Sequence, residues 1–95
     1  MQCDLHWEDA LKNRTQIDVY LEEVTGADII LLPELFSTGF SFASTHLAET
    51  MDGETLVWMK SVSKKKKAVL CGSVMIEDKG RVFNRLLCVQ PNGRV

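Results

Sequence analysis

The amino-acid sequence predicts an α/β layered domain. Two apolar runs, ADIILLP at 27–33 and AVLCGSVMIE at 68–77, lack the alternation of a half-exposed strand. Such runs are typical of parallel strands that are covered on both faces. Each run follows a segment whose apolar residues have helical spacing, at 8–25 and at 53–66. Helices and strands that alternate in this way indicate a sheet with helices packed on it.

The first helix is expected over residues 8–25. One apolar face is formed by positions i, i+3, i+4 and i+7, which predicts that these side chains are buried: Ile17, Tyr20, Leu21 and Val24. Asp9 or Glu8 suits the first turn, where the helix dipole favours an anion. Gly26 stands where a C-terminal cap is expected.

The elements that follow complete the predicted layer. After the strand at 27–33, residues 34–52 mix Gly, Ser and Thr with aromatics, as functional loops at the carboxyl end of a strand do. The second helix, at 53–66, is expected to bury Leu56, Met59 and either Val62 or Ser63. DKG at 78–80 is a turn, and RVFNRLLCVQ at 81–90 returns as a hairpin partner. Residues 1–95 are expected to form part of one domain, truncated at both ends.

Composition excludes several function classes. The 95 residues are 45% hydrophobic and 25% charged, as in ordinary globular chains, and the net charge of −2 gives no footprint for nucleic acid. No apolar run approaches the roughly 20 residues of a membrane span. Three cysteines (Cys3, Cys71 and Cys88) without CxxC spacing argue against a disulfide framework or a zinc site. They favour reduced thiols and a cytoplasmic location.

Glu34 is the principal candidate for chemistry. In LLPELFSTGF (31–40), Pro33 ends the buried strand and the carboxylate follows at once. Its functional interpretation is a general base at the mouth of a strand, beside apolar groups that raise its pKa. The alternative is a loop acid in water. Periodicity leaves both interpretations open.

Other candidates are weaker. Cys71 lies inside a continuing strand, without the cationic neighbour or helix N-terminus that a reactive thiolate needs. His6 and His46 have no nucleophile motif nearby and are interpreted as structural. KKKK at 64–67 surrounds a helix axis, which indicates a solvated helix end. Asn84, in an apolar strand, is expected to be buried and to pin a loop or a neighbouring strand through a hydrogen bond.

Five segments, taken in order, resemble the first part of a nitrilase-superfamily carbon–nitrogen hydrolase: DLHWED, LLPELFSTGF, AETMDGETLVWM, VLCGSVMIED and FNRLLCVQPNG. The segment MDGETLVWM at 51–59 is most similar to the omega-amidase branch. The resemblance covers essentially the whole chain. It implies the αββα layered sandwich of that superfamily, with residues 1–95 as its N-terminal part.

The resemblance also implies roles for individual residues. Glu34 matches the glutamate of a Cys-Glu-Lys triad, which takes the proton of the thiol. The cysteine attacks an amide carbon, ammonia leaves, and water hydrolyses the acyl-enzyme, while the lysine holds the oxyanion. Phe36 and Phe40 are expected to line the substrate pocket beside Glu34. The matching lysine and cysteine are expected beyond Val95, and neither a metal nor a cofactor is implied.

Two classes of function follow from this resemblance. In the first, the parent protein is an amidase that hydrolyses small monoamides, with 2-oxo acid omega-amides such as 2-oxoglutaramate as the expected substrates. In the second, the chain is a non-catalytic fragment or a structural remnant of that fold. The 95-residue chain alone is expected to be inactive and to self-associate as a homo-oligomer. No nucleic-acid or membrane partner is expected.

Overall fold

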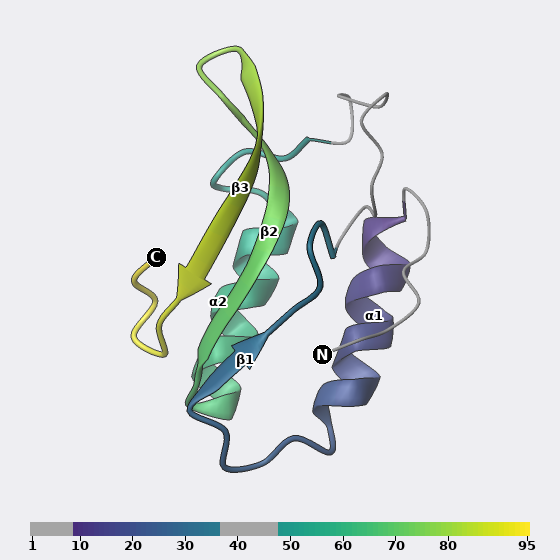
Figure 1. Ribbon diagram of the computed structural model, residues 1–95, viewed down its shortest axis with the longest axis vertical. Helices are drawn as coiled ribbons and strands as arrows, with labels where there is room; N and C mark the ends of the chain where they lie inside the picture. Colours follow the sequence, from purple (N-terminus) through teal and green to yellow (C-terminus); the bar gives the residue numbers. More distant parts are fainter. Residues whose placement is uncertain (1–8, 37–47) are drawn as a thin grey trace.

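The computed structural model describes residues 9–36 and 48–95, which form two helices and one mixed sheet (Figure 1). In chain order the elements are α1 (Ala10–Leu21), β1 (Ile29–Leu31), α2 (Glu54–Lys66), β2 (Val69–Asp78) and β3 (Arg81–Val89). The strand order is β1-β2-β3, with β1 parallel to β2 and β3 antiparallel to it. The predicted α/β class and the hairpin at 78–80 are therefore confirmed.

The hydrophobic core lies between the helices and one face of the sheet. In Figure 1 α2 lies behind β2 and β3, and α1 lies beside it. The expected inward residues of α2 are all buried, and Ser63 is buried together with Val62. They pack against the sheet residues of one pleat face, which are Ile30, Leu70, Val74, Ile76, Leu87 and Val89. In the part of the chain that the structure describes, no helix is long and apolar enough to cross a membrane.

Helix α1 is shorter than predicted, and one residue of its predicted buried face is exposed. It begins after Asp9, whose carboxylate accepts a hydrogen bond from the Lys12 backbone N–H. It ends at Leu21, and Gly26 supplies a positive φ of 71° in the turn before β1 instead of a cap. Ile17 and Leu21 are buried as expected, but Tyr20 is 48% exposed. The prediction for Tyr20 is therefore wrong.

Arg14 is a charged residue on the buried face of α1. Its guanidinium donates to the Thr55 hydroxyl at 2.8 Å and forms an ion pair with Glu54 at 3.3 Å, both on α2. These partners satisfy a charged side chain that is otherwise costly to bury. The buried residues of α1 are thus Asn13, Arg14, Ile17 and Leu21, while Tyr20 is exposed.

The start of α2 is tied to the sheet by Glu49. Its backbone forms an isolated bridge beside Ile76, accepting from Glu77 N–H at 2.8 Å and donating to the Met75 carbonyl at 3.0 Å. Its carboxylate accepts hydrogen bonds from the Thr55 N–H, at 2.8 Å, and from the Thr55 hydroxyl. Glu49 thereby caps the helix N-terminus, where an anion is favoured. It fixes the end of the loop that follows β1.

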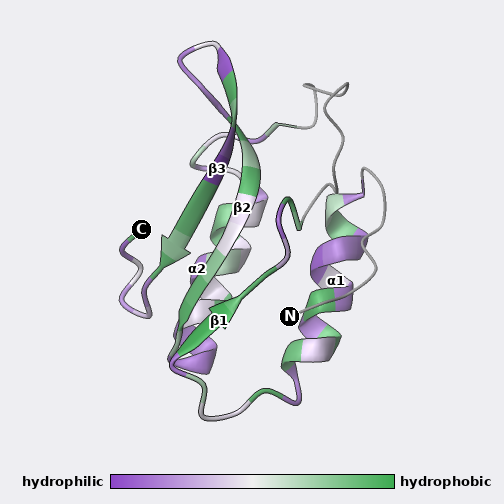
Figure 2. Ribbon diagram, viewed as in Figure 1, coloured by the Kyte–Doolittle hydropathy of each residue, from purple (hydrophilic) through white to green (hydrophobic). Residues whose placement is uncertain are grey.

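One face of the sheet carries exposed apolar residues, here called the open face. Ile29 and Leu31 of β1 are 60% and 62% exposed, and Leu86 of β3 is 69% exposed. In Figure 2 β1 and the C-terminal part of β3 are coloured hydrophobic, whereas the middle of β3 is hydrophilic. Burial on both faces is therefore wrong for β1 within the described residues, because α1 and α2 both pack on the side of Ile30.

Candidate active site

Glu34 is positioned by a tight turn directly after β1. Leu32 continues the ladder by one residue, donating its N–H to the Cys71 carbonyl at 2.8 Å. Leu35 then adopts a left-handed conformation, with φ 49°, and donates its N–H to the Ser73 hydroxyl at 2.8 Å. This turn leaves Glu34 exposed while Leu35 and Phe36 are buried. A left-handed leucine is costly, and the hydrogen bond to Ser73 helps to hold it.

Asn84 of β3 holds the carboxylate of Glu34. Its side-chain N–H donates to Glu34 Oε1 at 2.8 Å, between residues that are 50 positions apart in the chain. Because β2 lies between β1 and β3, the loop after β1 reaches across β2 to make this contact. The predicted pinning role of Asn84 is confirmed, whereas its predicted burial is wrong, since the side chain is exposed.

A cavity of about 430 Å³ surrounds this hydrogen bond on the open face. Its walls come from the end of β1 and the turn after it, from the first half of β2 and from the middle of β3: Leu31, Leu32, Glu34, Cys71, Gly72, Ser73, Asn84 and Leu86. Asn84 donates its hydrogen bond to one of the two carboxylate oxygens of Glu34, Oε1. The cavity therefore presents a carboxylate oxygen that can accept a proton, beside apolar walls. That is the arrangement a general base needs.

Phe36 lies on the other side of the sheet from this cavity. Its ring is fully buried in the core, 5.6 Å from the Trp58 ring centroid. A Cβ on Gly72 would come within 2.9 Å of the Phe36 ring, so glycine at this place in β2 makes room for it. Phe36 does not line the Glu34 cavity, and its expected contribution to a substrate pocket stays a prediction. Phe40, His6 and His46 lie outside the described residues.

Comparison with known proteins identifies the family. All 95 residues match the family of carbon–nitrogen hydrolases. The chain belongs to this family. This carbon–nitrogen hydrolase chain is 37% identical over 97 residues to omega-amidase YafV of Yersinia enterocolitica, and 34% identical over 95 residues to YafV of Escherichia coli K12. It is 26% identical over 98 residues to a 2-oxoglutaramate amidase of Bacillus subtilis. It spans 37–38% of the length of these curated relatives.

A solved relative confirms the fold of the carbon–nitrogen hydrolase chain. The chain superposes on XC1258 of Xanthomonas campestris, a CN-hydrolase superfamily protein with an arsenic adduct in its active site, with a TM-score of 0.94. The two are 37% identical, over 98% of this chain and 36% of that one. An N-terminal amidase at 24% identity and a TM-score of 0.83 shares the fold. The predicted fold class and superfamily are thus confirmed.

Cys71 of the carbon–nitrogen hydrolase chain has the character of a structural thiol. Its pKa is raised to about 11, first by burial and then by the hydrogen bond and the charge of the neighbouring Cys88 thiol. A raised pKa keeps the thiol protonated at neutral pH, which is the opposite of what a nucleophile requires. The sequence-based interpretation that Cys71 is not the nucleophile is therefore supported.

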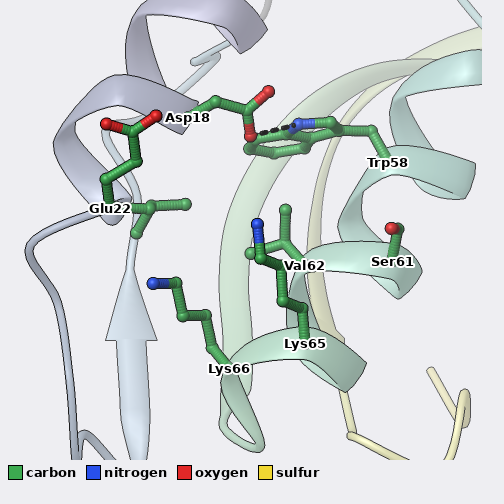
Figure 3. Close-up of a pocket in the computed structure, with 8 residues that line it drawn as sticks. Asp18, Glu22, Trp58, Ser61, Val62, Lys65 and Lys66 are labelled. Carbon is green, nitrogen blue, oxygen red and sulfur yellow. Dashed lines mark hydrogen bonds between the residues drawn. The ribbon is translucent and has the colours of Figure 1, made fainter.

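A second cavity of the hydrolase chain, of about 320 Å³, lies between α1 and α2 (Figure 3). The Trp58 indole N–H crosses it to donate to Asp18 Oδ1 at 2.9 Å. At its other end the Lys66 ammonium donates to the Val24 carbonyl at 3.1 Å. These two hydrogen bonds join α2 to α1 and to the segment that follows α1. Lys64–Lys66 form the last turn of α2, as a solvated helix end predicts.

Across residues 9–36 and 48–95, no three His, Cys, Asp or Glu side chains cluster as metal ligands.

Proposed function

We propose that this chain supplies the general base of an amidase that hydrolyses small omega-amides. The observation that carries the proposal is the Glu34 carboxylate, held by Asn84 at 2.8 Å at the edge of a cavity of about 430 Å³. The family supports hydrolysis of a C–N bond. The similar proteins named omega-amidase and 2-oxoglutaramate amidase support a 2-oxo acid omega-amide, such as 2-oxoglutaramate, as the substrate.

The proposed mechanism uses Glu34 as the base of a Cys-Glu-Lys triad. Glu34 takes the proton of a cysteine thiol, and the thiolate attacks the amide carbon. The tetrahedral oxyanion is stabilised by a lysine, ammonia leaves, and water then hydrolyses the thioester. The lysine and the cysteine are proposed to lie outside residues 1–95, which form the N-terminal part of the domain. Phe36 and Phe40 are proposed to shape the substrate pocket.

An assay of ammonia release from 2-oxoglutaramate tests this proposal. The native protein that carries this chain should hydrolyse 2-oxoglutaramate faster than an N-terminal glutamine peptide or an aliphatic nitrile. Residues 1–95 alone should release no ammonia, because a general base without its nucleophile cannot form an acyl-enzyme. Turnover by residues 1–95 alone would contradict the triad. A native protein inactive on all three substrates would support the second class, a non-catalytic remnant. For both classes we propose a cytoplasmic location.

Replacing Asn84 tests whether its hydrogen bond serves catalysis. Asn84→Ala should lower kcat of the native protein about tenfold, because the Glu34 carboxylate loses the hydrogen bond that orients it. KM and the melting temperature should change little, since Asn84 is exposed. Val82→Ala, on the same face of β3 but outside the cavity, is the matched control. Unchanged kcat in Asn84→Ala, or an equal loss in Val82→Ala, would contradict the assignment.

Self-association of residues 1–95 is expected from the open face. Ile29, Leu31 and Leu86 expose apolar surface on neighbouring strands, and a second copy can cover it. Sedimentation should therefore give a mass above that of the monomer. Leu86→Lys should lower the associated fraction, while Leu11→Lys, at a 68% exposed position on α1, should not. A monomer at all concentrations would contradict this expectation.

A further inference from the structure

Ser73 of β2 holds the turn that carries Glu34. Its hydroxyl accepts a hydrogen bond from the Leu35 backbone N–H at 2.8 Å, between residues that are 38 positions apart in the chain. Ser73 is 8% exposed and Leu35 is 1% exposed, so both partners are buried within this chain. The contact therefore does not depend on what covers the open face of the sheet.

A side chain, and not the backbone of β2, accepts this N–H. Leu32 donates to the Cys71 carbonyl at 2.8 Å, one residue beyond the paired residues of β1. Pro33 follows and has no N–H to donate. Two residues later the Ser73 hydroxyl takes the place of a backbone acceptor for Leu35. The position of the turn thus depends on a group that a single substitution can remove.

The turn needs such support because its backbone is strained. Leu35 has a φ of 49°, in the left-handed region that a residue with a Cβ adopts at a cost. Strained conformations persist only where the surrounding structure fixes them. Gly72 makes room for the Phe36 ring, and its neighbour Ser73 takes the Leu35 N–H. Loss of the Ser73 hydroxyl would leave a buried N–H without its acceptor, and the turn could relax.

We propose that Ser73 is a positioning residue of the amidase, which fixes the backbone next to Glu34 so that the carboxylate meets the thiol of the triad. This inference rests on the proposed function of Glu34. Asn84 of β3 holds one oxygen of the carboxylate, and Ser73 of β2 fixes the following residue of the backbone. Two strands thus determine the position of the base. Displacing a catalytic group by about 1 Å can lower the rate about 10²-fold.

Two variants of equal shape test the proposal in the native protein that carries this chain. Threonine keeps a hydroxyl group where valine has a methyl group. Ser73 lies in the wall of the Glu34 cavity, which leaves room for either branched side chain. For ammonia release from 2-oxoglutaramate, kcat of Ser73→Thr should exceed that of Ser73→Val about tenfold or more, with KM equal within about twofold. Equal kcat in the two variants would overturn the proposal.

Ser63 provides a matched control for the loss of a buried hydroxyl. It is fully buried in α2, and its hydroxyl lies 2.6 Å from the Ala68 carbonyl oxygen and 2.9 Å from that of Val89. Ser63→Ala and Ser73→Ala both remove a buried hydrogen bond, so both should lower the melting temperature. Only Ser73→Ala should lower kcat. An equal loss of kcat in Ser63→Ala would show that Ser73 supports stability alone.

The effect of Ser73 should also depend on Glu34. In the Glu34→Gln background, Ser73→Ala should lower kcat less than about twofold, because the base that Ser73 positions is absent. The same loss in both backgrounds would overturn a role through Glu34.

Hydrogen exchange separates this proposal from the proposed function. In the native protein, mass spectrometry of peptides that cover residues 32–36 should show at least about tenfold faster exchange of the Leu35 amide in Ser73→Val than in Ser73→Thr. Equal exchange would overturn the placement of Ser73, whatever the activity. A native protein that releases no ammonia from 2-oxoglutaramate would instead contradict the proposed function, and exchange would still decide whether Ser73 holds the turn.

Discussion

Glu34→Gln is expected to lower kcat/KM for amide hydrolysis by the native protein at least ~10²-fold, the lower range for loss of a general base. Glutamine keeps the shape of the side chain, and its carbonyl oxygen can still accept the hydrogen bond from Asn84. It cannot take a proton from a thiol, so formation of the thiolate would lose its base. Initial rates of ammonia release from 2-oxoglutaramate measure the effect.

Two controls accompany this prediction: a matched variant and a measurement of stability. Glu77→Gln removes an exposed carboxylate from β2, outside the cavity, and should leave kcat/KM unchanged within a factor of about two, as surface substitutions do. The melting temperature of Glu34→Gln should match that of the unaltered protein, because Glu34 is exposed. Activity of Glu34→Gln within a factor of a few of the unaltered protein would contradict its role as base.

Phe36→Ala is expected to have the largest effect on stability, a loss of about 3–5 kcal/mol in the free energy of unfolding. The Phe36 ring is fully buried among core residues and lies against Trp58 and the backbone of Gly72. Truncation leaves a cavity that these neighbours fill only in part. Urea denaturation of the chain measures the change in midpoint, and Phe36→Leu should lose less because it keeps most of the buried carbon.

Gly72 provides an independent check on the packing of Phe36. Gly72→Ala should destabilise the chain by about 1–3 kcal/mol, since its new methyl group would overlap the Phe36 ring. In the Phe36→Leu background the same substitution should cost less, because the ring is gone. If Phe36→Ala instead leaves the urea midpoint unchanged and raises KM, Phe36 lines the substrate pocket and is not a core residue.

The fold could be predicted from sequence wherever apolar periodicity settled the burial of a face. In α2 the inward residues Leu56, Met59 and Val62 were correct, and the polar residues buried beside them, Thr55 and Ser63, are satisfied by hydrogen bonds. In α1 Ile17 and Leu21 were correct, but Tyr20 is exposed, and Arg14 was missed because a charged residue is buried there through its bond to Thr55. For β1 the apolar run could not indicate that the described helices cover only one face.

The candidate site could likewise be predicted from the sequence only in part. The position of an acid at the end of β1 could be predicted, because Pro33 ends the apolar run and Glu34 follows it directly. That Asn84 reaches this acid depends on the strand order, which brings residues 50 positions apart together. The inward direction of Phe36 follows the left-handed turn at Leu35, a conformation that leucine rarely adopts and that no local pattern predicts.

A double-mutant cycle on Glu34 and Asn84 in the native protein tests the central claim most directly, namely that Asn84 serves catalysis by holding the base. Both single variants and the pair are assayed for kcat/KM with the same omega-amide. If Asn84 acts through Glu34, Asn84→Ala costs about tenfold in the unaltered protein and less than about twofold in the Glu34→Gln background. An equal loss in both backgrounds would contradict the claim.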